Sequence, residues 1–230
     1  MTKQTDILDD EKYRSILNEG FVGLIDYMGD DSSIVQAARV SYGAGTKKVS
    51  EDRGLIRYLM RHYHTTPSEM VTLKFHAKMP IFVARQWIRH RTASVNEYSG
   101  RYSIMVDEFY VPELEHILPQ STTNKQGRDG EMSMADKIAV RDEIIKSNIE
   151  CYNRYQNLLG GDLEKSSMVF SDSFEGISRE MARGVLSVNN YTEWYWKIDL
   201  HNLFHFLALR MDSHAQYEIR VFADAMYDLI

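Results

Sequence analysis

The sequence predicts an α+β fold in which helices and an antiparallel-type sheet share one domain. Hydrophobic residues make up 43% of the 230 residues, which is enough to bury the core of a domain of this length. Helical and strand patterns are mixed along the chain, without the strict strand–helix alternation of a parallel sheet. No Gly-x-Gly-x-x-Gly or Walker-type loop follows a strand pattern, so we expect a non-Rossmann fold. We therefore treat residues 1–230 as a single domain.

The first part of the chain is expected to contain a strand and two helices. Residues 1–18 are polar, and we expect them to form a mobile or loosely packed lead-in. Residues 21–28 resemble a short strand, and Asp31 with the two serines after it offers N-caps to a helix. A loop is expected over residues 43–52. An amphipathic helix is expected over residues 53–64, because its apolar residues recur at helical spacing.

The middle of the chain combines a strand, a short helix and irregular segments. From Val71 to Met79 apolar residues alternate with polar ones, which predicts a strand with one polar face. Pro80 suits the first turn of the helix that follows. Residues 103–111 are expected to be extended, and residues 118–134 to form a loop or insertion.

The last third of the chain is mainly helical. Residues 135–159 predict a long helix closed by Gly160 and the glycine after it. A shorter helix is expected over residues 179–186, and an aromatic-rich strand over residues 191–198. Residues 199–227 are expected to be helical, with an interruption near Asp212.

Charge and composition exclude several classes of partner. The formal net charge is −6, which argues against DNA or RNA as the main partner. The sequence carries no basic-then-apolar leader and no apolar run of about 18 residues, so neither secretion nor a membrane span is expected. Cys151 is the one cysteine, so no intrachain disulfide can form, which suits a reducing cytoplasm. It lies in a helical pattern without a basic neighbour, so we interpret it as a packing or surface residue.

The most informative segment is residues 85–102, where cations and polar side chains are concentrated. Its members are Arg85, Gln86, Arg89, His90, Arg91, Ser94, Asn96, Glu97, Ser99 and Arg101. Guanidinium groups match phosphate oxygens bidentately, and three consecutive basic side chains repel one another unless an anion lies among them. Such a segment can also be a solvated face or a salt-bridge ladder. We favour a pocket for a phosphorylated small molecule, with a nucleotide as the preferred ligand.

A second cluster lies in residues 199–214. His201 and His205 are four residues apart and share one helix face. A third metal ligand is not evident and the His-Glu-x-x-His pattern is missing, so no metal is expected. The pair can consist of satisfied polar histidines on a half-buried helix, or it can contact an anionic or heteroaromatic ligand.

The first cluster resembles a known family. Arg89-His90-Arg91, seven residues and then Ser99 match the Arg-His-Arg-x7-Ser signature of the flavin-dependent thymidylate synthases, and the likeness extends from about Gly20 to Gln216. The resemblance implies a single catalytic domain that converts dUMP to dTMP by reductive methylation. It also implies 5,10-methylenetetrahydrofolate as carbon donor, NADPH as reductant, and FAD bound at the subunit interfaces of a homotetramer. No protein thiolate would be needed.

The resemblance also implies roles for individual residues. Arg210 is the implied catalytic residue: it would bind the uracil ring and favour ionisation at N3, which a fixed guanidinium can stabilise. The implied substrate-binding residues are Gln86, Trp87, Ile88, Arg89, Glu97, Tyr98, Ser99, Gly100, Arg101, Arg183 and Arg210. The implied flavin-binding residues are Ser41, Thr66, Arg89, His90, Arg91, Glu97, Asp199, Leu200, His201 and His205.

Two points stay open. Some members of the family have Asn, Arg and Asn where this chain has Asp199, His201 and His205, so the resemblance does not define the flavin contacts of these three residues. His64 resembles a position linked to folate. A non-catalytic nucleotide-binding protein, or a metal-dependent nucleotide hydrolase using His201 and His205, remain alternative functions.

Overall fold

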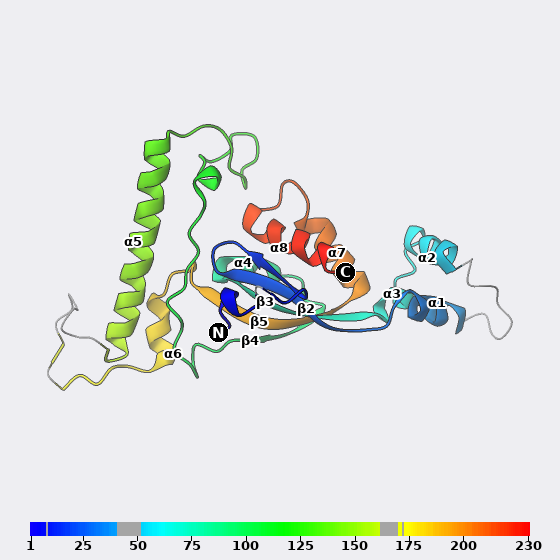
Figure 1. The fold of residues 1–230 in the computed structure, drawn as a ribbon, viewed down its shortest axis with the longest axis horizontal. Helices are drawn as coiled ribbons and strands as arrows, with labels where there is room; N and C mark the ends of the chain where they lie inside the picture. The colour runs from blue at the N-terminus through cyan, green and yellow to red at the C-terminus, as the bar shows by residue number, and fades with distance from the viewer. Residues whose placement is uncertain (8, 41–51, 162–169, 172) are drawn as a thin grey trace.

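The computed structural model describes residues 1–7, 9–40, 52–161, 170, 171 and 173–230. Its centre is a five-stranded sheet in the order β1-β2-β3-β5-β4 (Figure 1). The strands are β1 (Tyr13–Ile16), β2 (Gly20–Met28), β3 (Thr72–Pro80), β4 (Ala93–Glu97) and β5 (Tyr191–Asp199). Every pairing is antiparallel, and β4 is an edge strand. The expected α+β class with an antiparallel-type sheet is confirmed.

Three helices pack on the sheet and enclose the main core (Figure 1). They are α4 (Ile81–Trp87), α7 (Leu200–Arg210) and α8 (Tyr217–Asp228). Trp87 is fully buried at the centre of this core. Its ring centroid lies 5.4 Å from those of Trp194 and Trp196 and 5.2 Å from that of Phe206. This aromatic cluster packs α4 and α7 against β5. The positions of the residues that follow each of these two helices in the sequence are therefore fixed where the helices end.

The remaining helices lie at the two ends of the sheet (Figure 1). At one end are α1 (Asp31–Arg39), α2 (Asp52–Arg61) and α3 (Thr66–Glu69). At the other end are α5 (Met134–Leu158) and α6 (Arg179–Ala182), the latter continued by the 3-10 turn η6 (Arg183–Val185); a further 3-10 turn, η4 (Leu114–His116), precedes α5. No helix within these described ranges is long and apolar enough to cross a membrane.

The N-terminal segment is part of the fold, which corrects the expectation that residues 1–18 form a loosely packed lead-in. The segment forms the 3-10 turn η1 (Gln4–Ile7) and then β1, which pairs with β2. The backbone N–H and the hydroxyl of Thr2 donate to the Glu193 carboxylate over 2.7 and 2.8 Å. Tertiary hydrogen bonds therefore hold a segment whose polarity suggested solvent exposure.

The strand β3 has the expected polar face, and two of its polar residues, His76 and Lys78, are buried. His76 is 5% exposed and Lys78 is fully buried. The Lys78 ammonium donates to the Thr2 carbonyl over 2.9 Å and lies 2.6 Å from the Glu108 carboxylate. His76 contacts the Glu193 carboxylate over 2.7 Å. Thr2 of the N-terminal segment, together with Glu108 and Glu193, supplies the polar partners that make this burial tolerable.

Most of the predicted elements are found within a residue or two of their expected limits, although α2 ends at Arg61, three residues before the expected end. The predicted helix at 179–186 is divided between α6 and η6, and β1, α3 and β4 were not expected. The expected loop at 43–52 lies, apart from Asp52, outside the described residues. Residues 118–134, all of them described, form one bridge between Gln120 and Arg128, and Met134 begins α5. The predicted break in the C-terminal helical region falls between α7 and α8.

Candidate active site

The Arg-His-Arg segment begins where α4 leaves the core. Pro80 ends β3 and directly precedes the first residue of α4. The helix ends after Trp87, and the N–H of His90 donates to the Trp87 carbonyl over 3.0 Å in a tight turn. Arg89 and Arg91, on either side of His90, are exposed. Because Trp87 is fixed in the core, the start of the segment that carries the three basic residues is also fixed in position.

The end of α7 meets this segment directly. Nε of Arg210 donates to Nε2 of His90 over 3.1 Å, across 120 positions of sequence. The His90 ring lies edge-on to Phe206 at 4.9 Å and near His205 at 5.9 Å. Two segments that are far apart in the sequence thus lie in contact, which is what a shared site would require.

Burial and the neighbouring positive charge of Arg210 favour the neutral form of His90. Burial first, and the positive charge of Arg210 second, lower the pKa of His90 from 6.5 to about 4, with a smaller effect of His205. The imidazole is therefore neutral at physiological pH and accepts the hydrogen bond. Burial also lowers the pKa of Arg210, but a guanidinium stays charged in proteins. No carboxylate lies in ion-pair contact with Arg210 among the residues described, so its charge is available to an anionic ligand.

The start of α7 borders a cavity of about 260 Å³. The Asp199 carboxylate caps the helix by accepting from the backbone N–H and the side-chain amide of Asn202 over 2.9 and 2.7 Å. This cap positions His201 and His205, which line the cavity together with His64 and Thr65. Small-molecule sites usually enclose about 300–1,000 Å³. The cavity is therefore small for a dinucleotide, although its imidazoles and apolar walls suit a flat heteroaromatic ring.

His90 and Arg210 form one cationic group, which lies before the first residue of β4. A second cationic group, Arg101 and Arg183, lies beyond the last residue of β4. Gly100 is buried there, and a Cβ at this position would lie 3.3 Å from Cδ of Arg183 and 3.0 Å from Sδ of Met105. The glycine therefore permits the close approach of Arg183 to the segment that carries Arg101. The Arg101 guanidinium lies 3.2 Å from the Glu180 carboxylate, and both side chains are more than half exposed. An exposed pair of this kind is weak, so an incoming phosphate can displace it.

The strand β4 connects the two groups along the sheet edge. Ala93 pairs with Ile198 next to α7, and Glu97 pairs with Trp194. A strand rises about 3.3 Å per residue, so the five residues of β4 span roughly 16 Å. Arg101 and Arg183 therefore lie beyond one end of β4, and His90 and Arg210 lie beyond the other. His90 and Arg210 are in contact, whereas the expectation that all these cations line one cavity stays a prediction.

Several predicted site residues have specific positions. The Trp87 side chain is buried, so it can reach a ligand only through its backbone. Ile88 and Thr66 are exposed, and the Leu200 N–H donates to the Val71 carbonyl over 2.9 Å. Tyr98 donates its hydroxyl to the Ile104 carbonyl over 2.8 Å, which stabilises the turn that contains Ser99. Ser41 lies outside the described residues.

Sequence reasoning missed a partner of Glu97. The hydroxyl of Thr192, which is 1% exposed, donates to the Glu97 carboxylate over 2.7 Å. Thr192 stands in a strand pattern rich in aromatic residues, where a threonine carries no functional signal by itself. Only the pairing of β4 with β5 places it next to Glu97.

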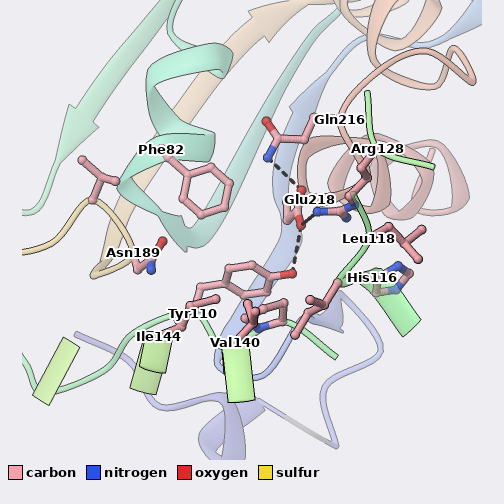
Figure 2. A pocket seen from close by; sticks show the side chains of 13 residues that line it. Phe82, Tyr110, His116, Leu118, Arg128, Val140, Ile144, Asn189, Gln216 and Glu218 are labelled. Carbon is pink, nitrogen blue, oxygen red and sulfur yellow. Dashed lines mark hydrogen bonds and ion pairs between the residues drawn. The ribbon is translucent and has the colours of Figure 1, made fainter. Parts of the chain in front are cut away.

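A larger cavity of about 370 Å³ lies away from this site, between α5 and the start of α8 (Figure 2). Apolar side chains such as Phe82, Val140 and Ile144 line it, and Glu218 lies at its polar side. None of the ligand-binding residues predicted from the sequence lines it. No group of three or more His, Cys, Asp or Glu side chains that could hold a metal is found in the described part of the chain.

Comparisons with known proteins agree on one family. The family described as "Thymidylate synthase complementing protein" matches residues 23–230. A flavin-dependent thymidylate synthase of Rickettsia bellii is 58% identical over 217 residues, covering 94% of this chain and 73% of that protein. The enzyme of the same description from Ruegeria pomeroyi is 55% identical over 226 residues, covering 97% and 71%.

Solved structures give the same result. A UMP/dUMP methylase, PolB, from Streptomyces cacaoi bound with 5-Br UMP superposes with a TM-score of 0.77 at 35% identity, covering 93% of this chain and 89% of that chain. The same protein bound with 5-Br dUMP gives a TM-score of 0.75 at 33% identity, covering 94% and 91%. Fold and site thus define an enzyme of the nucleotide-methylating class. Within that class, the chain belongs to the flavin-dependent thymidylate synthase family.

Proposed function

We propose that this enzyme makes dTMP from dUMP by reductive methylation, with 5,10-methylenetetrahydrofolate as carbon donor and NADPH as reductant through FAD. The hydrogen bond between Arg210 and His90 is the observation that carries the proposal. It joins the Arg-His-Arg segment to the helix that bears His201 and His205, so one site has a cation for the pyrimidine and imidazoles for a flavin. The single cysteine, Cys151, lies in α5 and not in the segments of this site, which agrees with a reaction that needs no protein thiolate.

Arg210 acts on the pyrimidine by electrostatics. Neutral His90 orients the guanidinium but does not cancel its charge. A fixed cation in a half-buried site stabilises negative charge that develops on the uracil ring. This charge raises the electron density at C5, the carbon that must attack the one-carbon unit. The phosphate of dUMP is held by Arg101 and Arg183, where Gly100 leaves room for a close approach.

The residues around the α7 cavity fit a flavin. Arg89 and Arg91 are exposed and form no ion pair among the described residues, so they are free to bind a pyrophosphate. His64, His201 and His205 offer a polar, ring-lined surface to the isoalloxazine. When bound, FAD supplies the redox chemistry that connects NADPH to the transferred carbon.

The complete site requires more than one copy of the chain. Arg210 and Arg183 lie beyond opposite ends of the exposed strand β4, and the flavin cavity is small for a dinucleotide. A homotetramer in which one copy provides the Arg210 group and another provides the Arg183 group removes both difficulties. An edge strand is a natural surface for such an association.

A steady-state assay tests the proposal. The purified protein, supplied with FAD, dUMP, methylenetetrahydrofolate and NADPH, should form dTMP. Replacing Arg210 with glutamine should lower kcat/KM by about 10²–10³, the usual effect of removing one preorganised electrostatic group. Arg154→Gln, on the exposed surface of α5, is the matched control and should have wild-type activity. Full turnover by Arg210→Gln would refute the assignment.

A further inference from the structure

A threonine inside the sheet contacts one of the predicted ligand-binding residues. Thr192 lies in β5, pairs with Met79 of β3 and is 1% exposed. Its hydroxyl donates to Oε1 of Glu97 over 2.7 Å. Burial of a hydroxyl without a partner is costly, and this hydroxyl forms no other hydrogen bond within the described part of the chain. A β-branched side chain has few rotamers, so the donor has a fixed direction.

Glu97 is exposed, and Thr192 is its one side-chain hydrogen-bond partner among the described residues. Its backbone is fixed at the end of β4, where Glu97 pairs with Trp194. The N–H of the next residue donates to the Glu193 carbonyl over 2.8 Å. An exposed glutamate otherwise has many rotamers, and holding one of them has an entropic cost. Both carboxylate oxygens can accept, and no hydrogen bond to Oε2 is found in the described ranges. The hydrogen bond from Thr192 thus orients the carboxylate and leaves Oε2 for a ligand.

Glu97 also stands next to a proposed phosphate-binding residue, Arg101, which follows it by four positions. The N–H groups of Tyr102 and Ser103 both donate to the Ser99 carbonyl, over 3.2 and 3.0 Å. The chain therefore turns immediately after β4 and keeps Arg101 near Glu97. In a nucleoside 5′-phosphate the sugar lies next to the phosphate, and the base is farther away. A phosphate bound by Arg101 thus brings the sugar of the nucleotide to Glu97.

We infer that Thr192 is a positioning residue, which orients the Glu97 carboxylate so that Oε2 accepts from the 3′-hydroxyl of dUMP. This inference rests on the proposed function, in which Arg101 and Arg183 hold the phosphate. The 3′-hydroxyl is the single free hydroxyl on the sugar of dUMP, and a hydroxyl can donate to a carboxylate. The contact makes no demand on N3 of the uracil ring, so it is compatible with the ionisation that Arg210 favours. Thr192 is buried and acts through Glu97, without touching the substrate.

The inference is tested by comparing dUMP with its 3′-deoxy analogue, whose dissociation constants are measured by calorimetry on the flavin-loaded protein. In the wild type the analogue should bind about ten-fold more weakly, the usual effect of losing one hydrogen bond to a carboxylate. Thr192→Val keeps the shape of the side chain but removes the hydroxyl. It should weaken dUMP and leave the analogue unchanged, so that the ratio of the two dissociation constants falls towards unity. A merely structural defect would weaken both nucleotides and leave the ratio as it is.

Thr192→Ser is the matched control, because it keeps the hydroxyl and loses only the methyl group; it should restore the wild-type ratio. Glu97→Ala, at an exposed position, should bring the ratio to unity and decides the question if Thr192→Val does not fold. A wild-type ratio in Thr192→Val or Glu97→Ala would overturn the inference, as would loss of flavin at an unchanged ratio, since Glu97 would then serve the flavin. A ratio of unity in a wild-type protein that binds dUMP would overturn the inference alone. Failure of the wild-type protein to bind dUMP would overturn the proposed function as well.

Discussion

Mixing two inactive variants tests whether each active site is built from two copies of the chain. Arg183→Ala and Arg210→Ala should each abolish dTMP formation, because each removes one of the two cationic groups. Within one chain these groups lie beyond opposite ends of β4, which spans roughly 16 Å. If one copy supplies Arg183 and another supplies Arg210, random assembly of both variants leaves both arginines intact in about one quarter of the sites, the product of two even chances.

Co-expression of the two variants at equal levels, with different affinity tags, provides the assay. Sequential purification on both tags isolates mixed oligomers, whose dTMP formation is then measured per bound flavin. The control pair is Arg210→Ala with His90→Ala, which alter the same cationic group. In this pair no copy of the chain has both His90 and Arg210 intact, so mixed oligomers should recover no activity. Equal and negligible activity for both pairs would refute the shared site.

Three further predictions concern stability. His90 takes up a proton near pH 6.5 in the unfolded chain but only near pH 4 in the folded chain. Protonation of the unfolded chain should therefore lower the free energy of unfolding as the pH falls from 6.5 towards 4, with no such loss above pH 6.5. Since His90 is only half-buried, the decrease should stay below about 1 kcal/mol per pH unit, and urea denaturation at pH 7 and pH 5 should show it in the wild type but not in His90→Gln. Trp87→Ala should lower the free energy of unfolding by about 3–5 kcal/mol, against little change for Met181→Ala, which is 71% exposed; a small effect would contradict the anchoring of α4. Deleting residues 1–7 removes the Thr2 carbonyl from buried Lys78 and should cost about 1–3 kcal/mol in thermal or chemical unfolding, whereas Lys3→Ala should be neutral; equal stability of the truncated chain would show that the segment is dispensable.

Periodic patterns predicted the long elements but not the sheet edges. The helix α5 and the strand β5 were predicted closely because their apolar residues recur over many positions. The strands β1 and β4 were missed because they are short and mostly polar on their exposed sides. Their pairing depends on partners distant in sequence, which local patterns do not encode. The burial of Lys78 was missed for the same reason: its partners are Thr2 and Glu108.

The candidate site, like the fold, could be predicted from the sequence only in part. The density of cations around Arg89, and its resemblance to a known signature, located one half of the site from the sequence. The direct contact of His90 with Arg210 depends on how α7 packs on α4. Sequence spacing gave no indication that Arg183 and Arg210 lie beyond opposite ends of β4. Nor did it connect Gln86 with Gln216, whose side chains share a hydrogen bond across 130 positions of sequence.

A titration of the flavin-loaded protein with dUMP, followed by the visible absorbance of the flavin, tests the central claim most directly. If the Arg-His-Arg segment and the end of α7 hold a pyrimidine against the isoalloxazine, dUMP should shift the flavin bands saturably. Arg210→Gln should weaken that response while the flavin stays bound. A protein that binds dUMP without any change in the flavin spectrum would show that the two ligands lie in separate sites, which contradicts the account.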